Sequence, residues 1–391
     1  MKSLQNLNDN NMIESAKRLE TVQEYYFSKK LREVRGLIEA GKPIINMGIG
    51  SPDLLPPTKV LDAIQKSLGD ASAHKYQSYQ GLPELRNAIT TFYKRKFSVD
   101  SNPENEVLPL MGSKEGIMHI SMAFLNEGDQ VLIPNPGYPT YTSVTKLVGA
   151  TPLFYNLSDA THWQPDFDAL ETQDLTGVKI MWVNYPHMPT GANATLETFE
   201  KLIAFGKKHQ ILIINDNPYS FILNDTPLSI LQVDGAKDIA LELNSLSKTF
   251  NMAGWRVGMV LGNSRYINEI LKVKSNMDSG MFYGIQKGAI EALQLSDDWF
   301  TAQNKIYKER RALIWQLADK LGARYDRNAT GLFVWAKIPQ GKKAVEVTDA
   351  VLYDKDIFIT PGTIFGSQGE GYIRFSLCVT SEVIKEAIQR L

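Results

Sequence analysis

The chain has 391 residues, which exceeds a usual single core and predicts two domains of unequal size. Hydrophobic residues make up 43% and charged residues 22%, and the formal net charge of −1 offers no global field that would recruit nucleic acid or an anionic membrane. The one cysteine, Cys378, excludes an intramolecular disulfide framework and a multi-cysteine metal site. We find no signal-peptide core and no apolar run of membrane-spanning length, so we expect a cytoplasmic protein without a metal.

The N-terminal region is predicted to form an arm rather than a domain. Residues 20–40 alternate apolar and charged side chains, which favours an amphipathic helix. Residues 41–53, GKPIINMGIGSPD, are typical of a turn that leads into the next domain. We assign residues 1–45 to this arm and to part of a small domain.

The central region alternates short apolar runs with longer helical patterns, which indicates parallel βαβ units. In one predicted helix, Ile117 and Ile120 fall on the same apolar face. The predicted fold class is therefore α/β, with a large domain over residues 46–284 that holds a seven-stranded, mainly parallel sheet between helices. The seven predicted strands cover residues 107–111, 130–134, 151–155, 179–185, 211–216, 239–245 and 256–262.

The C-terminal region has a different character. Long helical patterns around residues 284–321 are predicted to connect the two domains. Strand-like runs and a closing helix follow, which predicts a smaller α+β domain over residues 285–391. The predicted strands of this domain lie within residues 331–338, 357–362 and 372–379.

Residues 245–258, SLSKTFNMAGWRVG, place a lysine and an arginine eight residues apart beside small hydroxyl side chains. Lysine forms a Schiff base with an aldehyde cofactor when its site favours the neutral amine, which suggests this part for Lys248. Arg256 offers the planar fork of donors that suits a phosphate, and Ser245 and Ser247 add hydroxyl donors. The simpler interpretation is a loop with a solvated lysine and arginine.

Polar residues recur where the predicted strands end, and in open parallel sheets ligands bind at the carboxyl ends of the strands. The amides of Ser113 and Lys114 begin a helix and suit a phosphate. Tyr138 follows the next strand and can lie flat against an aromatic ring. Three later strands run into residues 184–191 and 215–219 and into the lysine segment, so five strand ends are predicted to meet at one site.

Together these segments resemble the class I/II aminotransferases, the fold-type I family of pyridoxal-phosphate enzymes. The resemblance implies that Lys248 holds the cofactor as an aldimine and that Tyr219 donates to the cofactor's ring oxygen. Asp216 follows a buried apolar run, so its carboxylate needs a cationic partner, which a protonated pyridine nitrogen supplies. Taken singly, Asp216 could be a strand-end cap and Tyr219 a core residue. Their order along the strand ends favours the cofactor interpretation.

The resemblance extends to both ends of the chain. Residues 76–89, YQSYQGLPELRNAI, are similar to the family segment whose first tyrosine reaches the phosphate in the partner subunit. This implies a homodimer with shared active sites, in which Tyr76 acts across the interface. Residues 361–377 resemble the family's closing motif, which implies that Arg374 binds the substrate α-carboxylate. The alternative for Arg374 is a surface charge on a strand.

Residues 46–53, NMGIGSPD, are similar to the family's loop at which Gly48 lies close to the substrate carboxylate. The Gly-x-Gly pattern could instead belong to a dinucleotide-binding loop. We reject this alternative because Asp53 stands where the third glycine belongs and no strand-to-helix unit follows.

One position departs from the family pattern. The family has an asparagine before the Pro-Thr-Gly of its third motif, and this chain has Met188 there. A thioether is a weak acceptor and no donor, so the contact to the cofactor ring oxygen and the substrate carboxylate is lost unless Asn184 or His187 replaces it.

The resemblance implies an aminotransferase that moves an amino group from an L-amino acid to a 2-oxo acid, with Lys248 as the general acid and base. A lyase that performs β-elimination with the same cofactor is the nearest alternative. A non-catalytic regulatory protein is a further one, but the chain has neither an added basic domain nor a missing lysine. No arginine, Arg265 included, can be assigned from sequence to a distal-carboxylate pocket.

Overall fold

The computed structural model describes residues 13–22, 24 and 26–391. Within these residues, no helix has both the length and the apolar character that a membrane crossing requires. The largest element is a seven-stranded sheet with the strand order β2-β8-β7-β6-β5-β3-β4. Its strands are β2 (Val107–Leu110), β3 (Gln130–Asn135), β4 (Thr151–Asn156), β5 (Val178–Val183), β6 (Leu212–Asp216), β7 (Ala240–Ser245) and β8 (Gly258–Gly262).

The predicted sheet is confirmed strand by strand, including its mainly parallel character. Six strands run in the same direction, and only β8 runs against its two neighbours, β2 and β7. Central strands are apolar on both faces because helices cover both, and β6 illustrates this. Leu212 and Ile214 point to one side and Ile213 to the other, as the two-residue period of a strand requires.

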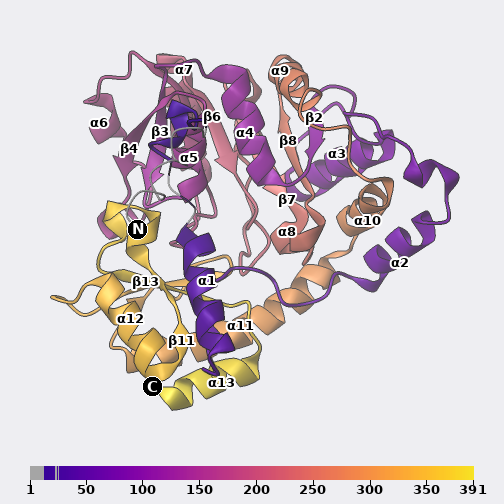
Figure 1. The fold of residues 1–391 in the computed structure, drawn as a ribbon. Coiled ribbons are helices and arrows are strands. Elements are labelled where there is room, and N and C mark those ends of the chain that lie inside the picture. The colour runs from indigo at the N-terminus through magenta and orange to yellow at the C-terminus, as the bar shows by residue number, and fades with distance from the viewer. Residues whose placement is uncertain (1–12, 23, 25) are drawn as a thin grey trace, which may run out of the picture.

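Helices pack on both faces of this sheet (Figure 1). Helices α4, α5 and α9 share a core with one face, and α3, α7 and α10 share a core with the other. The helices are α1 (Tyr26–Glu39), α2 (Thr58–Ser67), α3 (Pro83–Phe97), α4 (Ser113–Phe124), α5 (Pro139–Leu147), α6 (Phe167–Glu171), α7 (Leu196–His209), α8 (Leu246–Thr249), α9 (Ser264–Lys274), α10 (Tyr283–Leu293), α11 (Asp297–Lys320), α12 (Ala344–Lys355) and α13 (Ser381–Arg390).

A second, smaller unit is built mostly from the C-terminal third of the chain. Its four-stranded antiparallel sheet has the order β12-β13-β10-β9, and a two-stranded parallel sheet joins β1 to β11. Strand β1 comes from the N-terminal region, so both ends of the chain contribute to this unit. The strands are β1 (Ile45–Asn46), β9 (Arg324–Tyr325), β10 (Phe333–Lys337), β11 (Ile357–Phe358), β12 (Thr360–Pro361) and β13 (Tyr372–Ser376).

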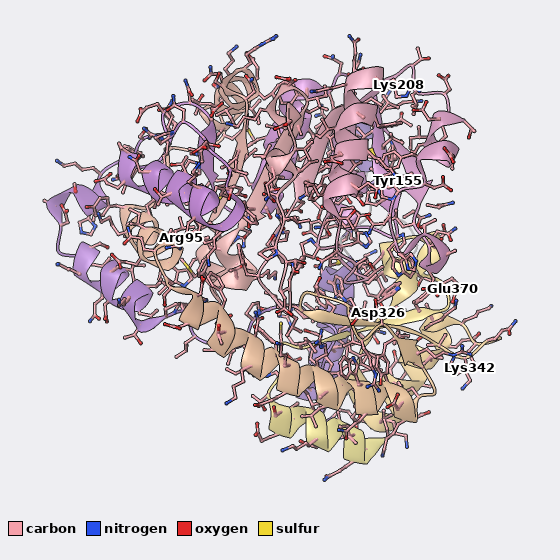
Figure 2. The ribbon with its side chains drawn as sticks, turned by 180° about the vertical axis from the view of Figure 1, so that it is seen from behind. Arg95, Tyr155, Lys208, Asp326, Lys342 and Glu370 are labelled. Carbon is pink, nitrogen blue, oxygen red and sulfur yellow. The ribbon has the colours of Figure 1, made fainter. Side chains whose placement is uncertain are left out.

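The two units are joined by α11, which runs from beside the large sheet to the lower half of the molecule (Figure 1). Figure 2 shows this arrangement from behind, with Tyr155 and Lys208 in the upper half and Lys342 and Glu370 in the lower half. Arg95 on α3 donates 2.8 and 3.1 Å hydrogen bonds to the carbonyls of Leu293 and Leu295, which fastens the segment before α11 to the large sheet's helices. The division at residues 45 and 284 stays a prediction.

Helix α1 covers Tyr26–Glu39 of the predicted helix over residues 20–40, of which residues 23 and 25 lie outside the described part. The helix stops at Gly41, whose φ of +86° is readily adopted only by glycine. The amide of Gly41 donates to the carbonyl of Ile38, and the amide of Lys42 to that of Leu37, which satisfies the last carbonyls of the helix. This stop directs the chain into β1.

Candidate active site

A cavity of about 490 Å³ lies between the carboxyl edge of the large sheet, the small unit and α1. Five strand ends meet there, as the sequence predicts. Most of the predicted site residues line this cavity: Ser113, Lys114, Tyr138, Asn184, Asp216, Tyr219, Ser245, Ser247, Lys248, Arg256 and Arg374. Gly48, Tyr76 and His187 are the predicted residues that do not.

The reversed strand β8 explains how Arg256 reaches this edge. Because β8 runs against its neighbours, its first residue, Gly258, pairs with Leu110 and Ser245 at their carboxyl ends. Arg256 precedes β8 and therefore projects at the same edge as Lys248, which follows β7.

Lys248 lies in the short helix α8, directly after β7. The hydroxyl of Ser245 accepts a 3.1 Å hydrogen bond from the amide of Ser247 and so caps this helix. The ammonium of Lys248 donates a 2.5 Å hydrogen bond to the carbonyl of Gly50. Burial lowers the pKa of Lys248, and the positive charges of Arg256 and Arg374 lower it further. The lowered pKa makes the neutral amine, which is the form that attacks an aldehyde, easier to reach than in a solvated lysine.

An anion cradle lies at the first turn of α4. Ser113 begins this helix, so its amide points out of a positive helix end. The guanidinium of Arg256 lies across the preceding Gly112, where a Cβ would come within 2.2 Å of Nη2. A Cβ on Gly258 would lie 2.7 Å from the amide nitrogen of Ser113, so glycine there allows the close approach of the two segments. These groups suit a phosphate.

Asp216 is buried at the end of β6, and its Oδ2 accepts a 2.9 Å hydrogen bond from the hydroxyl of Tyr141. Its other oxygen, Oδ1, is buried without a hydrogen-bond partner among the described residues. Burial raises the pKa of Asp216 to about 7, the bond from Tyr141 opposes this, and the charge of Glu242 adds to it. A buried carboxylate with one open oxygen suits a cationic N–H donor such as a protonated pyridine ring.

Tyr138 and Tyr219 are both at the cavity wall. Tyr138 contacts Tyr141 edge to face, with 5.5 Å between ring centroids. Tyr219 packs against the ring of Phe333 at 6.0 Å, and burial raises the pKa of its hydroxyl. The phenol of Tyr219 therefore stays protonated and can donate a hydrogen bond near neutral pH.

Arg374 lies opposite Lys248 in the small unit, on β13. Its Nη2 donates a 2.8 Å hydrogen bond to the carbonyl of Gly48, and its Nη1 lies 3.3 Å from the sulfur of Met188. Gly48 thus contacts the arginine rather than the cavity itself, and a Cβ there would lie 2.5 Å from the ring of Phe358. The guanidinium stays charged at all ordinary pH values, so its chemistry suits a carboxylate.

The structure separates the two candidates for the missing asparagine contact. Asn184 lines the cavity, but its Nδ2 donates to the backbone carbonyl of Asp216 and its Oδ1 accepts a 2.8 Å bond from the amide of Met188. His187 is buried outside the lining, and its Nδ1 lies 2.7 Å from the hydroxyl of Thr190. Burial lowers the pKa of His187 to about 3, so the ring is neutral and adds no charge that would attract a carboxylate.

Tyr76 lies outside the cavity lining in the single chain. Its side chain is 91% exposed and does not line the cavity. A large aromatic side chain with this exposure is consistent with a contact to a second copy of the chain. The shared site predicted for Tyr76 stays a prediction.

Sequence reasoning missed a buried polar network beneath the site. The carboxyl of Glu242, wholly buried on β7, accepts hydrogen bonds from Tyr93 (3.0 Å), Asn215 (3.2 Å) and the amide of Ile230 (3.0 Å). Asn215 neighbours Asp216 and also accepts from the amide of Tyr185, so this network joins β7 to the ends of β5 and β6. A polar residue inside the apolar run 239–243 is the signal that could have found it.

Three potential metal-binding side chains also gather near α4. Glu115, His119 and Asp278 bring one ligand atom each within 4.8 Å of one another. Both oxygens of Asp278, however, accept hydrogen bonds from the buried ammonium of Lys274, at 2.9 and 2.8 Å. The ammonium already supplies the positive charge, so this cluster is an ion-pair network in the fold.

The buried lysine, the first turn of α4 beside Arg256 and the open oxygen of Asp216 together suit a phosphorylated aldehyde with a ring nitrogen. A family model described as aminotransferase class I and II matches residues 42–391. The chain therefore belongs to the class I and II aminotransferase family, and it is a pyridoxal-phosphate-dependent aminotransferase that acts on amino acids and 2-oxo acids. This result favours the transferase interpretation over the lyase and regulatory alternatives.

Curated relatives cover almost the whole chain. It is 40% identical over 382 residues to the LL-diaminopimelate aminotransferase of Aquifex aeolicus. The aligned residues cover 97% of this chain and 99% of that protein. It is 41% identical over 379 residues to the LL-diaminopimelate aminotransferase 2 of Trichormus variabilis. That alignment covers 96% of this chain and 97% of the relative.

Solved structures agree with the fold. The substrate-bound BacF structure from Bacillus subtilis superposes with a TM-score of 0.93 at 34% identity and covers 97% of both chains. A single mutant of Thermus thermophilus aspartate aminotransferase has a TM-score of 0.90 at 23% identity, over 97% of this chain and 99% of that one, which shows a shared fold. The predicted fold class is thereby confirmed.

Proposed function

We propose that this aminotransferase holds pyridoxal phosphate through the Nζ atom of Lys248 and that the same atom moves the substrate proton. The supporting observation is that Lys248 is buried between Arg256 and Arg374, whose charges together with burial lower the pKa of its amine. A neutral amine both attacks the aldehyde and accepts a proton from the substrate Cα. When bound, the cofactor supplies an aldehyde for the substrate amine and a protonated ring that withdraws electrons.

The other residues proposed for the site bind and orient the cofactor. Arg256, Ser245, Ser247 and the first amides of α4, Ser113 and Lys114, form the proposed phosphate cradle. In the bound cofactor, Asp216 would accept from the ring N–H, Tyr219 would donate to the ring oxygen, and Tyr138 would pack against the ring. Together these residues would hold the ring in the cavity that Lys248 also lines.

Arg374 is the proposed anchor for the substrate α-carboxylate. Two of its contacts are neutral, the carbonyl of Gly48 and the thioether of Met188, and a thioether accepts hydrogen bonds weakly. A carboxylate can therefore displace Met188 and form a bidentate pair. Asn184 positions Asp216 and Met188 through its two hydrogen bonds, and His187 supports the same loop through Thr190.

Two further parts of the proposal concern assembly and location. We expect a homodimer in which Tyr76 reaches the phosphate of the partner subunit, since its side chain is exposed in the single chain. We place the enzyme in the cytoplasm, because its one cysteine, Cys378, is buried and unpaired, as is usual in a reducing compartment.

The names of the curated relatives make LL-diaminopimelate a candidate amino donor. The described cavity lining has five charged residues, and all of them are assigned above to the cofactor or the α-carboxylate: Lys114, Asp216, Lys248, Arg256 and Arg374. The proposed substrates are therefore L-amino acids as a class.

Borohydride reduction of the cofactor-loaded enzyme tests the central assignment. Peptide mapping should find the reduced adduct on Lys248, and the Lys248→Ala variant should bind the cofactor without acquiring a label. Lys114→Ala serves as the control, because it removes the other lysine of the lining and should still be labelled. An adduct on any other lysine, Lys114 included, would contradict the proposal.

A further inference from the structure

One wall of the cavity is mostly apolar. Phe27 and Leu31 come from α1, Ile49 from the loop after β1, and Phe333 and Phe365 from β10 and the short helix η8 (Gly362–Phe365). Phe27 and Leu31 are four residues apart and therefore lie on one face of the helix. Four separate segments of the chain thus contribute apolar side chains to this wall, and the hydroxyl side chains of Ser28 and Ser51 also line the cavity.

The charged residues of α1 point elsewhere. Lys30 pairs with Glu33 at 2.9 Å and with Asp349 at 3.5 Å, and Arg32 pairs with Glu24 at 2.5 Å. None of these side chains lines the cavity. The helix therefore presents Phe27, Leu31 and the small hydroxyl of Ser28 to the cavity, and its charged side chains are not part of the cavity lining.

The proposed carboxylate anchor is embedded in the same wall. The guanidinium carbon of Arg374 lies 3.8 Å from the ring centroid of Phe333, 4.6 Å from that of Phe365 and 5.6 Å from that of Phe27. An amino acid whose carboxylate is held by Arg374 and whose amine faces Lys248 has its Cα between them. Its side chain is then beside the phenyl rings and α1.

We propose that this wall selects amino acids with a large apolar side chain, phenylalanine foremost, as the amino donors of this enzyme. The inference rests on the proposed function. An aromatic side chain gains by leaving water and by edge or face contacts with other rings. A donor with a charged far end, such as LL-diaminopimelate or glutamate, would have to place that charge against hydrocarbon without a counter-charge from this wall.

Leu31 is the residue of this wall that we assign to specificity, because it is partly buried and lies one helical turn beyond Phe27. Ile38 offers a matched control on the same helix. Its side chain is 49% exposed and is outside the cavity lining.

The first test measures single-turnover conversion of the cofactor-loaded enzyme by phenylalanine, leucine, LL-diaminopimelate and glutamate. We expect rate constants divided by half-saturation concentrations to be at least about tenfold higher for phenylalanine than for either charged donor. Equal or faster conversion of LL-diaminopimelate would overturn the inference and leave the proposed function intact. If no donor converts the cofactor, the proposed function itself fails.

A second test measures binding without any reaction. Each of 3-phenylpropanoate and glutarate can place one carboxylate on Arg374, but the first ends in a phenyl ring and the second in another carboxylate. Calorimetry should therefore find that 3-phenylpropanoate binds at least about tenfold more tightly than glutarate. Tighter binding of glutarate would contradict the inference.

Substitutions in α1 test whether Leu31 determines the preference for an apolar ligand. Leu31→Arg should reverse the order of 3-phenylpropanoate and glutarate, whereas Ile38→Arg should leave it unchanged. Leu31→Met keeps an apolar side chain and should retain the preference, which separates selectivity from folding. An unchanged order in a folded Leu31→Arg protein would remove Leu31 from the assignment.

Discussion

The hydroxyl of Tyr141 donates a 2.9 Å hydrogen bond to Oδ2 of Asp216, and both side chains are buried. The ring of Tyr141 also stacks on Trp182, with 4.9 Å between centroids and 7° between planes, so the hydroxyl has a fixed direction. This bond leaves Oδ1 of Asp216 without a partner among the described residues, as the proposed contact to the cofactor nitrogen requires. We therefore expect Tyr141 to be a positioning residue that acts through Asp216.

Replacement of Tyr141 by phenylalanine tests whether Tyr141 positions Asp216. Loss of one hydrogen bond to a carboxylate costs about 1.5 to 3 kcal/mol, so Tyr141→Phe should slow the half-reaction by about tenfold or more and raise the apparent pKa of Asp216. Tyr155→Phe is the control, because Tyr155 is equally buried but donates its 2.7 Å bond to the carbonyl of Trp182. It should lower stability with little effect on the pH profile. A similar profile in both variants would contradict the assignment.

The pKa of Asp216 predicts how the stability of the cofactor-free protein depends on pH. Burial raises this pKa from 3.8 to about 7, so between these values the folded protein holds a proton that the unfolded chain has lost. Stability must therefore fall as the pH rises from about 4 to about 7. Asp216→Asn lacks this proton and should be more stable than the wild type above about pH 7, by on the order of 2 to 4 kcal/mol.

Urea unfolding of both cofactor-free proteins at about pH 5 and about pH 8 measures the difference. Bound cofactor should remove the slope, because a ring cation lowers the pKa of Asp216. The loaded Asp216→Asn enzyme should lose at least about a hundredfold in half-reaction rate. Parallel stability curves for the two cofactor-free proteins would exclude a raised pKa at this residue.

Gly112 provides a test of the anion cradle. Its φ is +90°, and a Cβ would meet the guanidinium of Arg256 at 2.2 Å. Gly112→Ala should therefore weaken cofactor affinity by about tenfold or more, since one phosphate contact is worth about 1.5 to 3 kcal/mol. Gly128 has nearly the same φ, +88°, and a Cβ there would have no atom of the described residues within 4 Å, so Gly128→Ala should lower stability without weakening cofactor affinity. Equal affinity in both variants would show that Arg256 moves aside freely.

Tyr76 and Lys248 allow a test of the shared site. Mixed dimers of Tyr76→Phe and Lys248→Ala subunits should contain sites in which both native residues meet, and these sites should recover activity over either parent. Native mass spectrometry would confirm that mixed dimers form. Mixed dimers without any recovery would mean that Tyr76 acts within its own chain or not at all.

We expect substitutions of Met188 and His187 to have different effects on substrate affinity. His187 is buried outside the cavity with its Nδ1 at Thr190, so His187→Ala should lower stability and change substrate affinity by less than about threefold. Met188→Asn replaces a weak acceptor of Arg374 by an amide, which should alter substrate affinity and the absorption of the bound cofactor. A large loss of affinity in His187→Ala, with no change in Met188→Asn, would restore His187 as the substitute for the family's asparagine.

The strands and the residues at their ends could be predicted because the signals are local. An apolar run followed by a glycine or a polar residue specifies where a strand stops, whatever it pairs with. Asp216 after Ile214 and Lys248 after Leu243 are examples, and both line the cavity as expected. The match of several such motifs to one family then implied the cofactor.

What only the tertiary structure decided depends on pairing between distant segments. No local pattern shows that β8 runs against its neighbours, yet this reversal brings Arg256 to the site. Residue spacing likewise leaves open where a side chain points, so Tyr141 was missed and His187 was expected in the cavity. Phe27 and Phe333 are separated by most of the chain and meet around Arg374 only because the two ends of the chain fold into one unit. Such contacts depend on the packing of distant segments, which local sequence patterns do not determine.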